Sequence, residues 1–202
     1  MEKIKMIKKT QQELLCLREY KFAGADSGNE ITVPVLEFPL LESTGIVAHC
    51  FTTRMGGVST GIFESMNLSF TRGDNPEAVL ENYRRIAGVM NAKIQRSTLT
   101  KESHIEITIA DFVCTDQTHT TNVMKVDETF KGYGVTRKKP YTDVDGLITN
   151  VPGVVLSTFY ADCVPLYFVD PVHKAIGLSH SGWRGTVGRM GIRTIEAMKE
   201  SY

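Results

Sequence analysis

A series of short strand-like segments in the second half of the sequence places the strongest constraint on the fold. Four such segments, rich in β-branched and apolar residues and separated by turn residues, follow one another: "GLITN", "GVVLSTFYA", "VPLYFVD" and "KAIGLSHS". An amphipathic helix follows only after the turn "SGWRG", in "GTVGRMGIRTIEAMKESY". Because the strands come in succession and helices stand before and after them, the sequence predicts a mixed α+β layered fold rather than a regular βαβ alternation.

The first half of the sequence predicts further strands and one long helix. The segments "ITVPVLEF" and "GIVAHCFTTR" are strand-like, as is the alternating "SHIEITIADFVC". The helix is "GDNPEAVLENYRRIAGVM", in which Asp74 or Asn75 can cap the first turn and apolar residues recur at helical spacing. Residues 1–28 are charged and weakly patterned, so we expect a peripheral segment there and the fold proper over residues 29–202.

The charge balance and the cysteines limit the partners and the compartment. Lys and Arg together number 23, as do Asp and Glu, so no general attraction to nucleic acid or to an anionic membrane is expected. No apolar run approaches the roughly 20 residues of a membrane span, and none of signal-peptide length follows the basic N-terminus. The 4 cysteines form no CxxC pair, which favours free thiols and a cytoplasmic protein.

His119, Cys163 and His180 are the candidates for a reactive site. His119, in "DQTHTTNV", and His180, in "LSHSGWRG", lie among polar residues and glycines at the ends of strand-like segments. Three N or S ligands with a vacant fourth position are the pattern of a catalytic zinc site. Spacing alone leaves three alternatives for Cys163, which are a buried structural residue, a thiol nucleophile and a metal ligand.

The neighbours of these residues suggest supporting roles. Asp162 precedes Cys163 in a strand-like segment, where a carboxylate needs a partner, and the outer N–H of a metal-bound histidine is a common one. The remaining histidines fit other roles: His173 is interpreted as a solvated loop residue, and His49 and His104 as histidines within sheets.

Two glycine-rich turns could bind an anion or simply reverse the chain. In "SHSGWRGTVG", Arg184 and the backbone N–H groups could hold a phosphate, or the turn could be an ordinary one with Trp183 packed inward. In "FTTRMGGVSTGIFESMNLSF", Arg54 and Asn67 flank a loop that could line a pocket or turn a corner. The sequence has no GxxxxGK[ST], GxGxxG or GxSxG motif, so the phosphate loop, the dinucleotide fold and the hydrolase elbow lack support.

Seven motifs in the same order carry a resemblance to one family. They are "FTTRMGGVSTG", "MNLSF", "GDNPEAVLENYRRI", "DQTHTTNV", "TDVDGLITN", "FYADCVPLYFVDP" and "LSHSGWRGTV", and with them the chain closely resembles the laccase-domain (polyphenol oxidase, YfiH-like) family from about Val33 to Met198. The resemblance implies a layered sandwich of mixed β-sheets flanked by helices. It also implies a metal bound by the histidine of "QxH", the cysteine of "ADC" and the histidine of "HSGWRG", which are His119, Cys163 and His180.

The resemblance also implies a domain arrangement. Residues 29–202 would be a laccase-domain (YfiH-like) metal-binding domain. The family normally continues for several tens of residues beyond Tyr202, so the resemblance predicts a domain that is truncated at its C-terminus. The family's usual glycine after the first metal histidine is Thr120 here.

The activity implied by the resemblance is on purine nucleosides. Family members are similar to enzymes that phosphorolyse adenosine and inosine, cleave methylthioadenosine and deaminate adenosine. We therefore expect a zinc-dependent purine nucleoside phosphorylase with adenosine deaminase side activity, whose partners are purine nucleosides and phosphate and which is a monomer or a small homo-oligomer. Copper is the alternative metal. A multicopper centre is excluded, because it needs several HxH pairs and the chain has none among its 5 histidines.

Two functions other than the phosphorylase remain open. The first is a peptidoglycan-precursor editing hydrolase that uses Cys163, and the second is a non-catalytic, metal-stabilised interaction protein. In the phosphorylase the predicted catalytic residues are Cys163, Asp162 and Arg184, and the predicted substrate-binding residues are Arg54, Asn67 and Gln117.

Overall fold

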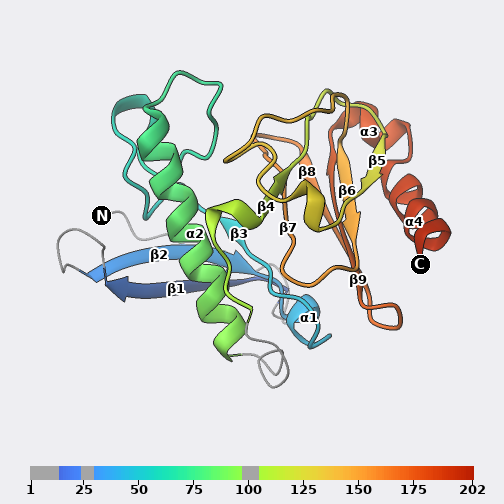
Figure 1. The fold of residues 1–202 in the computed structure, drawn as a ribbon, viewed down its shortest axis with the longest axis horizontal. Coiled ribbons are helices and arrows are strands. Elements are labelled where there is room, and N and C mark those ends of the chain that lie inside the picture. Colours follow the sequence, from blue (N-terminus) through green and yellow to red (C-terminus); the bar gives the residue numbers. More distant parts are fainter. Residues whose placement is uncertain (1–13, 24–29, 97–104) are drawn as a thin grey trace. The chain divides into compact units, whose positions relative to one another are not determined.

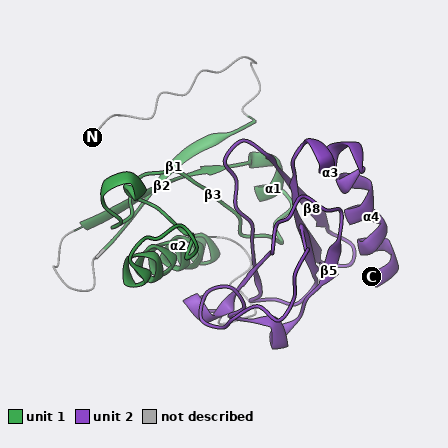
Figure 2. Ribbon diagram, turned by 90° about the horizontal axis from the view of Figure 1, so that it is seen from above, with its two compact units in different colours: residues 1–104 green, residues 105–202 purple. Residues whose placement is uncertain are grey.

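The computed structural model describes residues 14–23, 30–96 and 105–202. The chain divides into two compact units, residues 1–104 and residues 105–202 (Figure 2). The sequence had not predicted this division. Both units combine strands with helices, and the predicted α+β class is confirmed. Among the described residues, the helices lack the length and the apolar character that a membrane span requires.

The first unit contains an antiparallel sheet with the order β1-β2-β3 (Figure 1). Its strands are β1 (Cys16–Ala23), β2 (Glu30–Glu37) and β3 (Phe51–Thr52). β1 lies within the segment for which the sequence predicted no strand. The charged residues of this segment had suggested a loop. In the structure, Arg18 on β1 donates from Nε to Oε2 of the fully buried Glu37 on β2 at 2.8 Å, so a charge in the segment helps to pair the two strands.

Helix α2 (Pro76–Arg96) covers this sheet and confirms the predicted helix, which extends to Arg96. Asn75 satisfies its first turn, because its side-chain oxygen accepts from the N–H of Glu77 at 2.9 Å. The buried face of α2 includes Val79, Tyr83, Ile86 and Met90, which the apolar spacing had predicted. Two short helices complete the described part of the unit, α1 (Pro39–Glu42) and the 3-10 helix η1 (Gly61–Phe63).

The second unit is built on a four-stranded sheet with the order β5-β6-β9-β8. β5 and β6 are parallel, and β9 is antiparallel to both β6 and β8. A smaller parallel sheet pairs β4 with β7. The strands are β4 (Phe112–Cys114), β5 (Val123–Lys125), β6 (Gly146–Thr149), β7 (Val155–Ser157), β8 (Val164–Asp170) and β9 (Ala175–Ser181).

Two hydrophobic clusters fill the interior of the second unit. One surrounds the fully buried Leu147 of β6, and the other packs Ile148 against Met198 of helix α4 (Met190–Ser201). The successive residues of β6 therefore point to opposite faces, and both faces are covered. The short 3-10 helices η3 (Ile109–Asp111) and η4 (Glu128–Phe130) complete the unit, with helix α3 (Trp183–Val187).

Several predicted elements are shorter or divided in the structure. Of "GIVAHCFTTR" only Phe51–Thr52 is a strand, and of "GVVLSTFYA" only Val155–Ser157. Of "SHIEITIADFVC", only Phe112–Cys114 is a strand, and its first residues, Ser103 and His104, lie outside the described residues. The single helix predicted after "SGWRG" is two helices, α3 and α4, which meet at Gly188 and Arg189. Arg189 has the left-handed φ of 60°, which interrupts the helical backbone. Gly188 leaves room for Cγ2 of Thr121, which a Cβ there would approach to 2.7 Å.

Candidate metal centre

His119 lies in the loop between β4 and β5, in a backbone conformation that is uncommon for a residue with a side chain. Its φ is 66°, in the left-handed region. The loop turns around the carboxylate of Asp145, which accepts the backbone N–H groups of Thr118 at 3.2 Å, His119 at 3.1 Å and Thr120 at 2.8 Å. Three successive N–H groups aimed at one carboxylate are a fixed anion-binding loop, and here they set the position of His119.

His180 lies on β9 and is buried. Its backbone N–H donates to the carbonyl of Asp145 at 2.7 Å, and its ring Nδ1 lies 2.7 Å from Oδ1 of the same residue. A carboxylate is an acceptor, so Nδ1 carries the proton and the lone pair of the neutral ring is on Nε2. His180 therefore has one nitrogen available as a ligand.

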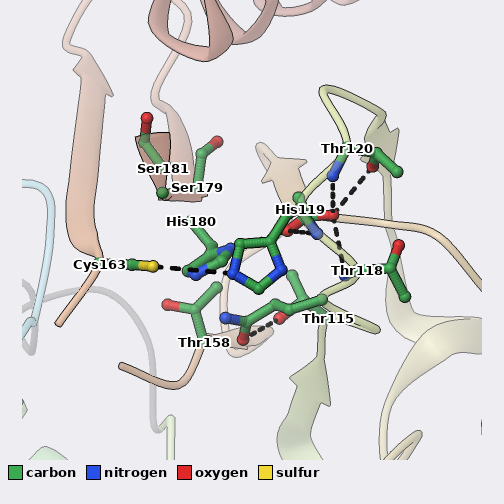
Figure 3. A network of polar contacts seen from close by, with 12 residues as sticks. Thr115, Thr118, His119, Thr120, Thr158, Cys163, Ser179, His180 and Ser181 are labelled. Atoms are coloured by element: carbon green, nitrogen blue, oxygen red, sulfur yellow. Dashed lines mark hydrogen bonds and ion pairs between the residues drawn. The ribbon is translucent and has the colours of Figure 1, made fainter. Parts of the chain in front are cut away.

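Cys163 immediately precedes β8 and brings a thiol to both rings (Figure 3). Its Sγ lies 3.8 Å from Nε2 of His119, and one ligand atom from each of Cys163, His119 and His180 lies within 4.8 Å of the others. A tetrahedral zinc with ordinary bond lengths holds its N and S ligands about 3.3–3.6 Å apart. The three atoms are thus near the spacing that one cation requires.

The donor set suits a single metal ion with an open side. His119 is exposed, Cys163 is half-buried and His180 is buried, so the three close one side of a site and leave the His119 side accessible. Desolvation and the neighbouring Asp162 carboxylate raise the pKa of the Cys163 thiol. A raised pKa is the opposite of what an activated thiol nucleophile needs, whereas a bound cation would deprotonate the thiol.

Asp145 supports this site, and sequence analysis had not selected it. The expected orienting carboxylate was Asp162, but the residue bonded to His180 is Asp145. Asp162 is exposed, and its Oδ1 lies 3.7 Å from Sγ of Cys163. Burial alone would raise the pKa of Asp145, but bonds from His180, Thr120 and Thr118 hold it below its ordinary value. Its position just before the buried strand "GLITN" was the available signal, because a carboxylate there needs partners.

Gly182 and Tyr160 also shape the centre and had not been selected. A Cβ on Gly182 would lie 2.9 Å from Cδ2 of His119 and 3.0 Å from Sγ of Cys163, so these two side chains approach the backbone where only glycine leaves room. The ring of Tyr160 lies 5.8 Å from that of His180, and its hydroxyl reaches the carbonyl of Ser179 at 3.2 Å. Tyr160 thus ties the segment before Cys163 to β9.

The two amides predicted to bind substrate are engaged in loops of the protein itself. Gln117 donates from Nε2 to the carbonyl of Phe159 at 2.6 Å and accepts from the N–H of Phe159 at 2.7 Å. Asn67, in the first unit, donates to Oδ2 of Asp74 at 2.9 Å and accepts from the N–H of Ser69 at 3.0 Å. Their observed contacts are structural, and a substrate role for either stays a prediction.

The two arginines lie in different units. Arg54 is exposed in the first unit and lines a pocket of about 300 Å³ with five other residues, so its loop forms a pocket wall. Its Nη2 donates to the carbonyl of Glu64 at 3.0 Å. Arg184 is exposed on α3 in the second unit, 5.4 Å from the ring of Trp183. Trp183 is 72% exposed, so the expectation that it packs inward is wrong.

The other two histidines that the structure describes, His49 and His173, are not part of this cluster. His49 precedes β3 instead of lying within a strand, so its predicted place in a sheet is wrong. His49 is buried in the first unit, where its Nε2 accepts from the N–H of Phe38 at 2.9 Å, and burial lowers its pKa to about 4. His173 lies in the exposed turn after β8, with Nδ1 2.7 Å from Oδ2 of Asp170, as a loop histidine was expected to lie. His104 lies outside the described residues.

Comparisons with known proteins agree on one family. The family model described as multi-copper polyphenol oxidoreductase laccase matches residues 48–202. A purine nucleoside phosphorylase of Deinococcus radiodurans is 36% identical over 169 residues, which cover 83% of this chain and 56% of that protein. Adenosine deaminase RL5, from an unknown prokaryotic organism, is 31% identical over 150 residues, which cover 73% of this chain and 52% of that protein.

A solved structure is also similar to this chain. The crystal structure of YlmD from Geobacillus stearothermophilus has a TM-score of 0.58 and 36% identity, covering 69% of this chain and 46% of that one. The chain spans about half the length of the curated relatives that it matches.

Proposed function

The chain belongs to the multi-copper polyphenol oxidoreductase laccase family, and from this membership we propose that it is a metal-dependent purine nucleoside phosphorylase. The observation that carries the proposal is the convergence of His119, Cys163 and His180, whose ligand atoms lie within 4.8 Å of one another although the residues come from three separate segments. Relatives named purine nucleoside phosphorylase support the reaction class.

The donor set favours one ion, and zinc over copper. Two imidazoles and one thiolate are ligands that zinc takes in catalytic sites, with a fourth position left for water or substrate. Copper remains the alternative, since it also accepts imidazole and thiolate ligands. A cation held there would supply a positive charge for an oxygen of phosphate or of the sugar, and would lower the pKa of a bound water to about 7 for deamination.

In the proposed reaction an oxygen of phosphate attacks C1′ of the ribose. The C1′–N9 bond breaks, its electron pair leaves with the purine, the base takes up one proton, and ribose 1-phosphate is the second product. Arg184 is the proposed phosphate-binding cation of the second unit, since its exposed guanidinium lies on the helix that follows His180. Asp162, exposed beside Cys163, is the proposed proton carrier for the departing base.

Arg54 is the proposed substrate-binding residue of the first unit. It lines a pocket of about 300 Å³, a volume at the lower end of the roughly 300–1,000 Å³ typical of small-molecule sites. Asn67 lines the same pocket and stays a proposed substrate-binding residue. We propose that Gln117 shapes its loop rather than contacts substrate, because its amide group bonds to Phe159. The proposed substrates are adenosine, inosine and methylthioadenosine. A relative named adenosine deaminase supports the deaminase side activity.

The alternative of a hydrolase with Cys163 as nucleophile has less support. The raised pKa of the thiol keeps it protonated at neutral pH unless a cation binds. None of the four cysteines, all of which the structure describes, forms a disulfide, as the sequence predicted, and reduced thiols persist in a reducing compartment. We therefore retain the cytoplasm as the proposed location.

Release of hypoxanthine from inosine tests the proposal. The zinc-loaded chain is incubated with inosine, with and without phosphate, and both products are measured by chromatography. We expect hypoxanthine and ribose 1-phosphate in equal amounts, dependent on phosphate and lost in Cys163→Ala. The Cys114→Ala variant is the matched control, since Cys114 is a buried thiol of β4 outside the ligand set. If the zinc-loaded wild type releases no hypoxanthine, the phosphorylase proposal is contradicted. If that protein nevertheless binds zinc, the remaining function is a non-catalytic, metal-stabilised interaction protein.

A further inference from the structure

The carboxylate of Asp145 is fully buried in the second unit and is surrounded by donors. Its Oδ1 is bonded to Nδ1 of His180 and to the N–H of His119, at 2.7 and 3.1 Å. Its Oδ2 accepts from the N–H of Thr118 at 3.2 Å and from Thr120, through the N–H at 2.8 Å and the hydroxyl at 2.9 Å. A buried charge with this many donors is held in one orientation.

We propose that Asp145 is the positioning residue that prepares the metal centre before the ion binds, by placing the proton of His180 on Nδ1 and by holding the loop of His119. The inference rests on the proposed function, in that it takes His119 and His180 to be metal ligands. Asp145 contacts the site only through other residues, so its role is in setting their geometry and tautomer.

The first part of the role concerns the His180 ring. A neutral imidazole can carry its proton on either nitrogen, and the hydrogen bond at one nitrogen decides which. Because Asp145 can only accept at Nδ1, it leaves the lone pair on Nε2. The main chain is held as well, since the backbone N–H of His180 donates to the carbonyl of Asp145 at 2.7 Å. One residue thus fixes both the backbone and the tautomer of this ligand.

The second part concerns the His119 loop. Its left-handed backbone is uncommon outside glycine and needs compensation from its surroundings. The bonds from the N–H groups of Thr118, His119 and Thr120 to Asp145 provide it. The hydroxyl of Thr120 adds a further donor to Oδ2. The same carboxylate therefore ties together two ligands that are 61 positions apart in the sequence.

Replacing Asp145 with asparagine tests the first part, and it also removes the acceptor of the His119 N–H, which is bonded to Oδ1 at 3.1 Å. The amide oxygen is expected at the place of Oδ2, because the opposite orientation would turn the amide NH₂ toward the N–H groups of both Thr118 and Thr120. The NH₂ then lies at the place of Oδ1, opposite Nδ1 of His180. Since NH₂ only donates, His180 must carry its proton on Nε2, which blocks the ligand atom.

Asp143 offers a matched control on the same segment. It is exposed, and its Oδ1 accepts from the hydroxyl of Thr118 at 2.6 Å. Asp143→Asn makes the same chemical change two residues away and near the same loop. It leaves the contacts of both histidine rings intact.

The experiment uses the full chain with zinc as the probe. The nitrogen shifts of ¹⁵N-labelled His180 give the tautomer of the metal-free protein, and competition with a chromophoric chelator gives zinc affinity. We expect Nδ1–H in the wild type and in Asp143→Asn, and Nε2–H in Asp145→Asn with zinc affinity reduced about 10- to 100-fold, the range typical when a ligand's outer hydrogen-bond partner is removed.

Several results overturn the inference. One is a zinc affinity of Asp145→Asn within twofold of the wild type, and another is an unchanged tautomer in that variant. If Asp145→Asn does not fold, the wild type decides alone, because Nε2–H in its metal-free state contradicts the role. Failure of the proposed function is distinguishable. A wild type with the expected tautomer and zinc affinity that releases no hypoxanthine contradicts the phosphorylase but supports the role of Asp145.

Discussion

Substituting alanine for Gly182 should weaken metal binding without unfolding the protein. The new Cβ would lie 2.9 Å from Cδ2 of His119 and 3.0 Å from Sγ of Cys163, both short of the 3.4 Å at which ordinary contact begins. The backbone of Gly182 itself, with φ −76° and ψ −174°, is extended and suits alanine. The strain therefore falls on the two ligands rather than on the fold.

The size of the effect follows from the displacement. Relief of the contacts requires the His119 ring or the Cys163 sulfur to move by about 0.4–0.5 Å, which exceeds the roughly 0.2 Å tolerance of metal–ligand distances. In the metal-free protein the exposed His119 side chain can move at little cost. We expect zinc affinity to fall by about tenfold or more, which is about 1.4 kcal/mol per tenfold, and the melting temperature of the metal-free protein to stay unchanged.

The assay is chelator competition for zinc, run beside thermal melting of the metal-free variants. Gly185→Ala is the matched control, since a Cβ there lies in α3, 3.3 Å from Oγ of Ser181 and 3.6 Å from the carbonyl oxygen of His180, and its three nearest atoms include no ligand side chain. Wild-type zinc affinity in Gly182→Ala would refute the reasoning, because the ligands would then not occupy the observed positions. If both variants lost zinc affinity equally, the cause would be a disturbance of helix α3 and not contact of the new Cβ with the ligands.

Three further predictions concern metal content, buried charge and pH. Cys163→Ala should lose about one zinc per chain by elemental analysis, whereas Cys114→Ala should retain it; retention in both would remove Cys163 from the ligand set. Glu37→Gln should lower the free energy of unfolding by about 1–3 kcal/mol in urea titrations, because the buried ammonium of Lys93 loses its carboxylate partner at 2.6 Å and keeps only that of Glu42 at 3.3 Å; a change below 1 kcal/mol would contradict this. Burial alone would raise the pKa of Glu37, but bonds from Lys93 and Tyr20 lower it. The stability that the Glu37 carboxylate contributes should therefore be present above the unfolded pKa of about 4.3 and be lost as the pH falls. The free energy of unfolding of Glu37→Gln should change less with pH in the acid range.

The elements with strong periodicity could be predicted from the sequence. Helix α2 follows from its apolar spacing and its cap at Asn75, and the strand-rich second half follows from alternation and turn residues. Strand β1 could not be predicted, because its charged residues resemble those of a loop. Arg18 is exposed, yet it pairs with the buried Glu37 on β2, and only the fold shows this contact.

The same limit applies to the site. The sequence motifs identified His119, Cys163 and His180 as candidate metal ligands, and the fold brings these three residues together. Asp145 and Asp162 are both acidic residues next to strand-like segments, and only the three-dimensional arrangement shows that Asp145 bonds to His180. Likewise, nothing in the sequence shows that the amide of Gln117 bonds to Phe159. Residue type indicates what a side chain can do, and its partners decide what it does.

Anomalous diffraction from crystals of the zinc-loaded chain, measured on both sides of the zinc edge, tests the metal centre most directly. The account predicts one peak per chain, about 2.0–2.3 Å from Nε2 of His119, Sγ of Cys163 and Nε2 of His180, with Nδ1 of His180 still bonded to Asp145. A crystal that contains zinc at other residues, or none at these three, would contradict the account.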